Sequence, residues 1–449
     1  MQKSKQNYAC ENCGAEYVGW QGQCTYCKEW NTIVEQKIEE IEAQTILKLS
    51  SVLTKVNLAE IEVPSEKRIS TKISEFDRVL GTDNQNLESG LMPGSVILLT
   101  GEPGIGKSTL LLQLAINLSQ EGEKILYISG EESISQIASR AKRLNSKQPN
   151  VSLVNSYDLT QILELIKKEE EVSTIILDSI QTISSMETRG IAGGMSQIKY
   201  CAALLISTIK QLNKSLIIVG HINKEGTIAG PKLLEHLVDV VLLFSGEDKS
   251  SLRILRATKN RYGSTDELGL FNMQEDGLLS ITNPADFFLS EGESTTKNIV
   301  AGTCPTIVVE GKRPLIMEIQ ALVIPTNFSL PKRVSEGISL ARVQMICAVL
   351  TKYLKLNLAN SDIYINIPQG FKVSDRGIDL AVAIAIISSA INKPLKQGAI
   401  AFGEISLSGS INLAMFQKKR VTEVERLGYL NLINKESIKH VSNLLSLFK

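Results

Sequence analysis

The chain has 449 residues, of which 43% are hydrophobic and 21% charged, a composition typical of globular proteins with two or three domains. Lysine plus arginine and aspartate plus glutamate both total 48, so the overall field attracts no particular partner. The first ten residues lack the apolar core of a signal peptide, and no apolar run reaches about 18 residues. We therefore expect a cytoplasmic protein without membrane partners, in which nucleic-acid binding depends on local clusters of cations.

Four of the seven cysteines form two CxxC pairs: Cys10, Cys13, Cys24 and Cys27. Paired thiolates at this spacing close on one tetrahedral zinc ion, and no histidine near them offers a further ligand. Cysteine fills all four positions, so we expect residues 1–34 to form a zinc-binding (Zn²⁺) module whose metal is structural. Residues 35–64 lack glycine and are weakly periodic, which indicates a linker.

Between residues 65 and 290, strand-like apolar runs alternate with helical patterns. The clearest runs are SVILLT, KILYIS, STIILDSI, SLIIVGHI and DVVLLF, and this alternation predicts a parallel sheet covered by helices. Residues 291–449 show a different order, which predicts a separate α/β domain. Its expected elements are two hairpin strands within 300–323, a helix over 338–354, a strand over 362–368 and a helix over 377–391.

The segment after SVILLT fits the phosphate-binding motif GxxxxGK[ST] and precedes the helical run LLLQLAINL. Its residues are Gly101, Glu102, Pro103, Gly104, Ile105, Gly106, Lys107, Ser108 and Thr109. The glycines let backbone N–H groups surround phosphates, and a helix N-terminus adds a favourable dipole. We expect Lys107 to contact the β and γ phosphates of ATP, Ser108 to hold Mg²⁺, and Thr109 to support Ser108.

Acidic residues follow two other apolar runs of the same domain. Asp178 ends STIILD, where a carboxylate can hold the water shell of Mg²⁺, with a structural cap as the alternative. Glu131 and Glu132 follow KILYIS, and either can polarise the water that attacks the γ phosphate. Helix capping by these glutamates is the alternative reading.

These motifs resemble those of the bacterial RadA (Sms) family of DNA repair ATPases. The resemblance rests on the CxxC pairs followed by WNT, on GEPGIGKSTLLLQ, SGEES, GHINKEGTIAGPKLLEH and KNRYG, and it spans essentially the whole chain. It implies an α/β fold with a RecA-like P-loop ATPase core, an N-terminal four-cysteine zinc ribbon and a C-terminal Lon-protease-like domain. It also implies an ATP-driven motor on single-stranded and branched DNA, a homohexameric ring, and branch migration alongside the RecA recombinase.

The resemblance gives roles to two glycine-rich segments, 184–200 and 223–232, because the corresponding segments of RecA-like rings line the central pore. Their cations are candidates for binding the DNA backbone: Arg189, Lys199, Lys224 and Lys232. Solvated loops without a ligand are the alternative. His221 ends the strand before the second segment and is either a sensor of the γ phosphate or a hydrogen-bonded structural histidine.

The run LRILRATKN ends in Lys259, Asn260 and Arg261, the beginning of the KNRYG motif. In a ring we expect this tip to face the neighbouring subunit, where Lys259 or Arg261 can act on the γ phosphate in trans, as an arginine finger does. Contact with DNA is the second reading, and a solvated turn is the third. The sequence leaves all three open.

The expected Lon-like domain lacks peptidase chemistry. Such peptidases use a Ser–Lys dyad, and the aligned positions here are Ile378 and Arg420, neither of which can act as nucleophile or base. We therefore expect a scaffold, with cations that form a DNA-binding face if they converge: Lys312, Arg313, Lys332, Arg333, Arg342, Lys372, Arg376, Lys418, Lys419 and Arg420. The alternative overall function is an ATP-gated DNA-binding adaptor without steady turnover.

Overall fold

The structure is a computed structural model that describes residues 7–10, 16–17, 19–26, 28–36, 67–82, 88–144, 150–188, 190–221, 234–246, 250–289, 300–328 and 330–448. It divides into two compact units, Met1–Ser245 with Arg253–Ser280, and Gly246–Leu252 with Ile281–Lys449. The sequence predicted a boundary at residue 290, but helix α8 (Pro284–Phe288) belongs to the second unit. The reason is packing, because Phe288 meets Phe371 edge-on at 5.5 Å between ring centroids.

The described part of the N-terminal segment is a small antiparallel sheet in the order β2-β1-β3. Its strands are β1 (Asn7–Cys10), β2 (Glu16–Tyr17) and β3 (Ile33–Gln36). Cys10, Cys24 and Ile33 are buried together, with Tyr8 and Tyr17 packed against them. This cluster is too small to be an ordinary apolar core, as expected for a module folded around a metal.

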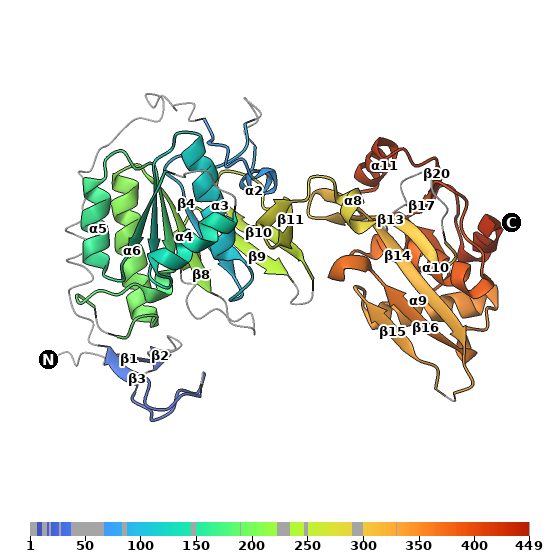
Figure 1. The fold of residues 1–449 in the computed structure, drawn as a ribbon. Helices are drawn as coiled ribbons and strands as arrows, with labels where there is room; N and C mark the ends of the chain where they lie inside the picture. Colours follow the sequence, from blue (N-terminus) through green and yellow to red (C-terminus); the bar gives the residue numbers. More distant parts are fainter. Residues whose placement is uncertain are drawn as a thin grey trace, which may run out of the picture. The chain divides into compact units, whose positions relative to one another are not determined.

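A nine-stranded sheet forms the centre of the first unit, in the order β12-β11-β10-β9-β4-β8-β7-β5-β6 (Figure 1). Its strands are β4 (Val96–Gly101), β5 (Ile125–Ser129), β6 (Val151–Asn155), β7 (Thr174–Asp178), β8 (Ser215–His221), β9 (Val240–Gly246), β10 (Leu252–Asn260), β11 (Leu268–Gln274) and β12 (Gly277–Ser280). Strands β4 to β9 pair in parallel, which confirms the predicted parallel sheet.

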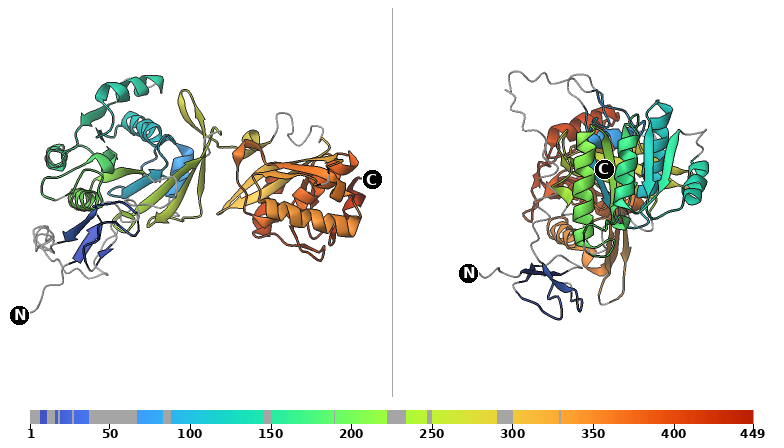
Figure 2. Two further views of the ribbon diagram at one scale, coloured as in Figure 1. Left: turned by 90° about the horizontal axis from the view of Figure 1, so that it is seen from below. Right: turned by 90° about the vertical axis from the view of Figure 1, so that its left-hand side faces the viewer.

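Helices cover both faces of this sheet (Figures 1 and 2). They are α2 (Ser74–Leu80), α3 (Lys107–Gln120), α4 (Ile134–Arg143), α5 (Leu159–Lys168) and α6 (Met195–Gln211), with a short 3₁₀ turn η2 (Ile180–Thr182). Alternation along β8 shows why two layers are needed: Ile217 and Val219 join the cluster that contains α3, whereas Leu216 and Ile218 join the cluster of α5 and α6.

The second unit is built on a four-stranded sheet in the order β13-β14-β16-β15. Its elements are β13 (Thr303–Glu310), β14 (Arg313–Pro325), β15 (Arg333–Glu336), α9 (Leu340–Leu354), η3 (Leu358–Asn360), β16 (Ser361–Asn366), η4 (Pro368–Gly370), η5 (Arg376–Ile378), α10 (Asp379–Ile391), β17 (Ala399–Ala401), β18 (Glu404–Ile405), β19 (Ile411–Asn412), α11 (Gln417–Arg426), β20 (Asn431–Ile433) and η6 (Val441–Phe448). The predicted hairpin and both predicted helices are confirmed. Among the described residues, no helix is long and apolar enough to cross a membrane.

Candidate nucleotide-binding site

The phosphate-binding loop, residues 101–109, connects the end of β4 to the first turn of α3. Glycine is required at two of its positions for different reasons. A Cβ on Gly101 would lie 2.3 Å from the carbonyl oxygen of Phe244 on the adjacent strand. Gly106 has a φ of 110°, and a Cβ there would meet the Met273 side chain at 2.8 Å. The backbone therefore turns tightly enough to present N–H groups around a phosphate.

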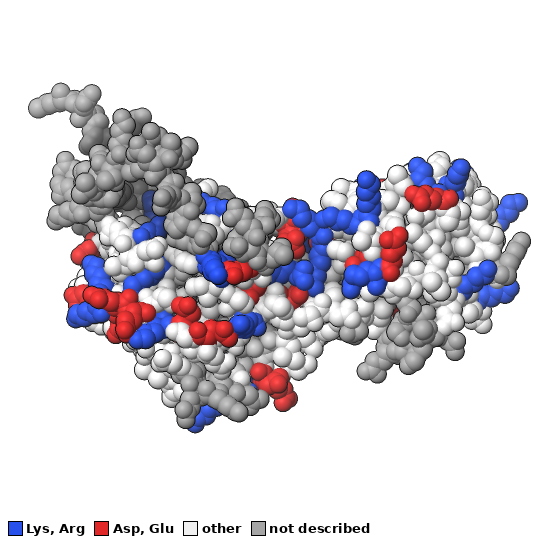
Figure 3. All heavy atoms as spheres, turned by 90° about the horizontal axis from the view of Figure 1, so that it is seen from above, with Lys and Arg blue, Asp and Glu red and all other residues white. Residues whose placement is uncertain are grey.

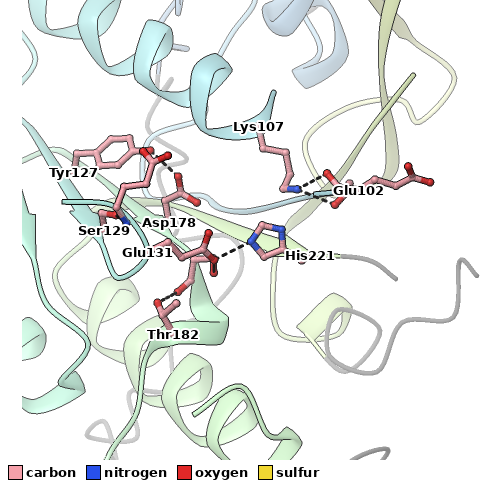
Figure 4. A network of polar contacts seen from close by, with 11 residues as sticks. Glu102, Lys107, Tyr127, Ser129, Glu131, Asp178, Thr182 and His221 are labelled. Carbon is pink, nitrogen blue, oxygen red and sulfur yellow. Dashed lines mark hydrogen bonds and ion pairs between the residues drawn. The ribbon is translucent and has the colours of Figure 1, made fainter. Parts of the chain in front are cut away.

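Lys107 begins α3 and is buried, with 4% of its surface exposed. Its Nζ donates hydrogen bonds to the carbonyl oxygens of Gly101 at 2.8 Å and Glu102 at 2.9 Å (Figure 4). Burial lowers the pKa of Lys107 to about 8, and the carboxylates of Asp178 and Glu131 oppose that shift. A buried ammonium facing two carboxylates is suited to bind phosphate oxygens.

Asp178 ends β7 and is also buried, with 4% of its surface exposed. Its Oδ2 accepts a hydrogen bond from the Tyr127 hydroxyl at 2.8 Å (Figure 4). Its Oδ1 is buried with no donor in bonding geometry among the described residues, although the Ser108 hydroxyl is near enough to lower the pKa of the carboxyl. Burial is the larger effect and raises the pKa of Asp178. An unsatisfied carboxylate oxygen beside a hydroxyl suits a hard cation, so these residues fit Mg²⁺.

The structure separates the two glutamates that follow β5. The Glu131 carboxylate accepts hydrogen bonds from the Ser179 hydroxyl and from His221 Nε2, the latter at 2.9 Å. The hydrogen bond from His221 is the main reason that the pKa of Glu131 is lowered. Glu132 instead forms an ion pair with Arg140 on α4. Glu131 therefore belongs to the cluster that contains the P-loop lysine, and Glu132 does not.

The capping alternative for these glutamates does not hold. Ser133 is the N-cap of α4, and it exchanges hydrogen bonds with Gln136 in a capping box.

Gly130 has a packing role, because a Cβ there would lie 2.0 Å from the Thr182 hydroxyl oxygen. The chain after β5 therefore passes directly over the turn that follows Asp178.

The first candidate DNA segment, 184–200, is only partly a loop. Helix α6 begins at Met195, so Lys199 lies on the helix, where it is exposed. The Gln197 side chain ties the loop to this helix by donating to the carbonyl oxygens of Ser185 at 3.0 Å and Gly190 at 3.2 Å. The other three nominated cations lie outside the described residues: Arg189, Lys224 and Lys232.

The KNRYG cations are bonded within their own chain. Lys259 Nζ donates to the carbonyl oxygens of Glu235 at 2.7 Å and Val238 at 2.8 Å. Arg261 Nη1 lies 3.1 Å from a carboxylate oxygen of Asp239, which is buried. These contacts argue against the solvated-turn reading, and they leave a role in trans and contact with DNA as open alternatives.

The same motif lies far from the P-loop of its own chain. At the start of β10, Arg253 Nε donates to the carbonyl oxygen of Ile105 in the phosphate-binding loop at 3.1 Å. Arg261 follows the other end of the strand and contacts Asp239, whose backbone N–H bonds to Val96 at the start of β4. Eight residues of extended strand separate the two arginines by roughly 25 Å. Lys259 and Arg261 therefore do not serve the nucleotide site of their own chain.

The second unit contains no dyad at the predicted positions. Ile378 is buried with 1% of its surface exposed, and Arg420 with 0%. The Arg420 guanidinium forms an ion pair with Asp375 and donates to the carbonyl oxygens of Ile307 and Met415. This position therefore holds a saturated structural cation, with no group able to accept a proton.

Several cations nominated for a DNA face serve the fold instead. Arg342 pairs with the buried Asp379, and Arg333 donates to the carbonyl oxygens of Ser361 and Leu358. Arg313 is buried, with 6% of its surface exposed. The face drawn in Figure 3 carries cationic and anionic side chains interspersed. DNA binding by this unit would depend on the remaining cations, which are Arg376 and the lysines.

Three described residues near the site carry no motif in the sequence. They are Tyr127, Ser179 and Arg253, which bond to Asp178, Glu131 and the Ile105 carbonyl oxygen. Only Arg253 could have been found from the sequence, as a charged residue in an otherwise strand-like run. The other two depend on which strands become neighbours.

The zinc module can be described at two of its four predicted ligands. Cys10 and Cys24 are buried in the same cluster, whereas Cys13 and Cys27 lie outside the described residues. Within the described part of the chain, no group of three or more metal-binding side chains is assembled. Two adjacent buried thiols fit half of a tetrahedral four-cysteine site.

A P-loop lysine after β4, a buried carboxylate that fits a cation at the end of β7 and a glutamate after β5 lie at one edge of a parallel sheet, an arrangement typical of a P-loop ATPase. In agreement, an AAA domain family matches residues 63–227, and a rubredoxin metal binding domain family matches residues 8–35. The AAA domain implies ATP and Mg²⁺, and the metal binding domain implies Zn²⁺.

Relatives that match the whole chain identify its family more specifically than these two domain families do. The DNA repair protein RadA of Rickettsia bellii is 42% identical over 438 residues, 97% of this chain and 95% of that protein. The RadA proteins of Bacillus subtilis and Listeria monocytogenes are each 40% identical, covering 96% of this chain and 93% and 92% of theirs. The chain belongs to the RadA family of DNA repair proteins. With the site described above, it is a DNA repair ATPase.

Proposed function

We propose that the protein is a DNA-dependent ATPase that drives branch migration on recombination intermediates, as a homohexameric ring alongside the RecA recombinase. The observation that carries the proposal is the 2.9 Å hydrogen bond between Glu131 and His221. Glu131 lies beside the P-loop lysine, and His221 is the last residue of β8, directly before the glycine-rich segment 223–232. One hydrogen bond therefore joins the nucleotide site to a segment that is expected to hold DNA.

Hydrolysis needs a base for the attacking water, and Glu131 is better suited than Glu132. Glu131 lies beside Lys107, where its carboxylate can orient a water and accept its proton. Lys107 would hold the β and γ phosphates, and Ser108 with Asp178 would hold Mg²⁺, which neutralises charge on the phosphates. Glu132 is occupied by Arg140.

Coupling between ATP hydrolysis and DNA binding would arise because the attacking water and His221 compete for the same carboxylate, that of Glu131. A carboxylate that orients water beside a γ phosphate makes weaker hydrogen bonds to its protein partners, since its lone pairs are shared. The bond to His221 would then differ before and after hydrolysis. In this proposal the Glu131–His221 pair has two arrangements, and nucleotide and DNA each favour one of them.

The position of KNRYG supports an assembly in which subunits complete one another's sites. Arg253 bonds to the phosphate-binding loop, and along the extended strand Lys259 and Arg261 lie roughly 20 Å and roughly 25 Å from Arg253. A ring would bring them to a neighbouring nucleotide or to DNA.

Steady-state ATP hydrolysis with and without single-stranded DNA tests the proposal, together with DNA binding at matched salt. We expect DNA to stimulate the wild type, and Lys107→Ala to reduce hydrolysis by about 100-fold. His221→Ala should retain basal hydrolysis but lose most of the stimulation. An enzyme that binds ATP and DNA but shows no stimulation would contradict the motor and favour the adaptor.

Lys259→Ala, compared with Lys210→Ala, decides the role of KNRYG. Lys210 is a matched control because its Nζ also lies near this turn, 3.1 Å from Asp239. If Lys259→Ala still binds DNA but its ATP hydrolysis is no longer stimulated by DNA, and Lys210→Ala behaves as the wild type, the motif acts in ATP hydrolysis. If Lys259→Ala loses DNA binding and Lys210→Ala does not, the motif contacts DNA.

A further inference from the structure

Tyr127 lies inside the apolar layer between the central sheet and α3. It is on β5 with 1% of its surface exposed, and it packs with Ile217, Val219 and Leu111. Phenylalanine would fill this space equally well. A phenol hydroxyl taken out of water there costs free energy unless it finds a partner.

Strand register brings that hydroxyl to Asp178. Tyr127 pairs with Ile176 across β5 and β7, and Ser129 pairs with Asp178. Side chains two residues apart on a strand share a face, so Tyr127 and Asp178 project toward the same side of the sheet. The hydroxyl donates to Oδ2 at 2.8 Å (Figure 4).

We propose that Tyr127 is a positioning residue for Mg²⁺: by occupying Oδ2 it directs Oδ1 of Asp178 toward the cation beside Ser108. This inference rests on the proposed ATPase site. Tyr127 belongs to no recognised sequence motif.

The two oxygens of Asp178 have different surroundings, which is what such a role requires. Oδ2 has a fixed donor on a rigid strand, whereas Oδ1 is buried without a donor in bonding geometry among the described residues. Without the tyrosine hydroxyl, the carboxyl group could rotate and both oxygens would compete for the cation.

Tyr127→Phe removes the hydroxyl and preserves the ring. The probe is a fluorescent ATP analogue, whose binding is measured in EDTA and then across a Mg²⁺ titration. We expect Tyr127→Phe to bind the analogue with wild-type affinity in EDTA. When Mg²⁺ is added, the affinity should rise as in the wild type, but the Mg²⁺ concentration at which half of this rise is reached should be about tenfold higher. Hydrolysis should recover at saturating Mg²⁺.

Tyr429→Phe is the matched control, since it deletes a tyrosine hydroxyl in the second unit that has no hydrogen-bond partner among the described residues. It should leave the Mg²⁺ titration unchanged. A double variant adds a second readout: in an Asp178→Asn background, Tyr127→Phe should shift the Mg²⁺ requirement no further, because its target is gone.

The outcomes are distinct. If Tyr127→Phe lowers the thermal midpoint but leaves the Mg²⁺ requirement unchanged, the hydroxyl is only structural and the proposal is overturned. A shift of equal size in both backgrounds would also overturn it. If the wild type shows no Mg²⁺-dependent nucleotide binding, the proposed ATPase site itself fails.

Discussion

Lys107 is a buried cation whose pKa is lowered to about 8, chiefly by loss of hydration. The protonated form binds phosphate, and raising the pH through this value removes it. We therefore expect the affinity for an ATP analogue to be constant below pH 7 and to fall about tenfold per unit well above pH 8. Lys107→Arg keeps its charge and should lack this slope even if its affinity is lower. A wild-type affinity that is flat from pH 7 to 10 would contradict the assignment.

Glu131 and Glu132 are adjacent in sequence, but their partners differ. Glu131→Gln should lower the rate of hydrolysis by about 100-fold or more while ATP binding persists, because only the proton acceptor is lost. Glu132→Gln is the matched control and should retain most of the rate, since its carboxylate serves the Arg140 ion pair. Rapid-quench measurement of a single turnover separates chemistry from product release. Equal losses in both variants would refute the assignment.

At the scale of secondary-structure elements, the KNRYG turn binds the C-terminal end of α2 through hydrogen bonds and close packing. Asn260 Nδ2 donates to the Leu80 carbonyl oxygen at 3.0 Å, and Gly263 lies so near Gly81 that a Cβ would be 3.4 Å from its Cα. The Asn260 side chain also accepts a hydrogen bond from the Tyr262 backbone N–H at 2.9 Å. Asn260→Ala should therefore reduce the free energy of unfolding by about 1–2 kcal/mol, since each partly buried hydrogen bond contributes about 1 kcal/mol or less. Urea denaturation followed by circular dichroism measures it.

Ser264→Ala is the control in the same turn, because its hydroxyl bonds to the exposed Asp266. It should change the free energy of unfolding by no more than about 0.5 kcal/mol. If Asn260→Ala were equally neutral, the turn would not fasten α2, and any loss of function in KNRYG variants would belong to ATP or DNA alone.

In the second unit, Arg420 joins α11 to β13 and to the segment before η5. Arg420→Met should destabilise the unit by about 3–5 kcal/mol, because the nearly buried carboxylate of Asp375 loses its counter-ion and keeps only backbone N–H donors from Val309 and Gly377. Arg420→Met with Asp375→Asn should cost less than the single change, since no charge is stranded. The second-unit transition in urea denaturation reports both. A single variant less damaging than the double would show that the pair is dispensable.

At the scale of the whole molecule, the zinc module carries both tryptophans of the chain. Trp20 and Trp30 are 61% and 66% exposed and flank Gly22. Metal removal should unfold the module and change tryptophan fluorescence, while the ATPase core, which has no tryptophan, still binds nucleotide. Chelation with fluorescence and nucleotide binding measured in parallel checks this.

Cysteine variants provide the control for that experiment. Cys24→Ser should abolish the expected single zinc per chain. Cys201→Ser should retain it, because Cys201 is buried on α6 and burial raises the pKa of its thiol to about 12. Zinc content measured by atomic absorption distinguishes them. One zinc per chain in Cys24→Ser would show that the predicted ligand set is wrong.

The sequence alone determined what depends on consecutive residues. The phosphate-binding loop is nine residues in a row, and two of its glycines, Gly104 and Gly106, adopt a positive φ that is a local property of the backbone. The strands around it are continuous apolar runs because both faces of a parallel sheet are covered. At the two positions that align with the Ser–Lys dyad in the resemblance to Lon peptidases, the sequence has Ile378 and Arg420, neither of which can act as nucleophile or base. Such features need no knowledge of which segments become neighbours.

Tertiary structure decided what depends on contacts between distant segments. Glu131 and Glu132 have different partners because Ser179, which follows β7, and His221, at the end of β8, bond only to Glu131. Tyr127 reaches Asp178 because β5 pairs with β7 in one register. Lys199 lies on α6, which begins at Met195, and Gln197 ties the preceding loop to that helix. A hydrogen bond depends on position to within a few tenths of an ångström, and only the packed sheet sets positions that closely.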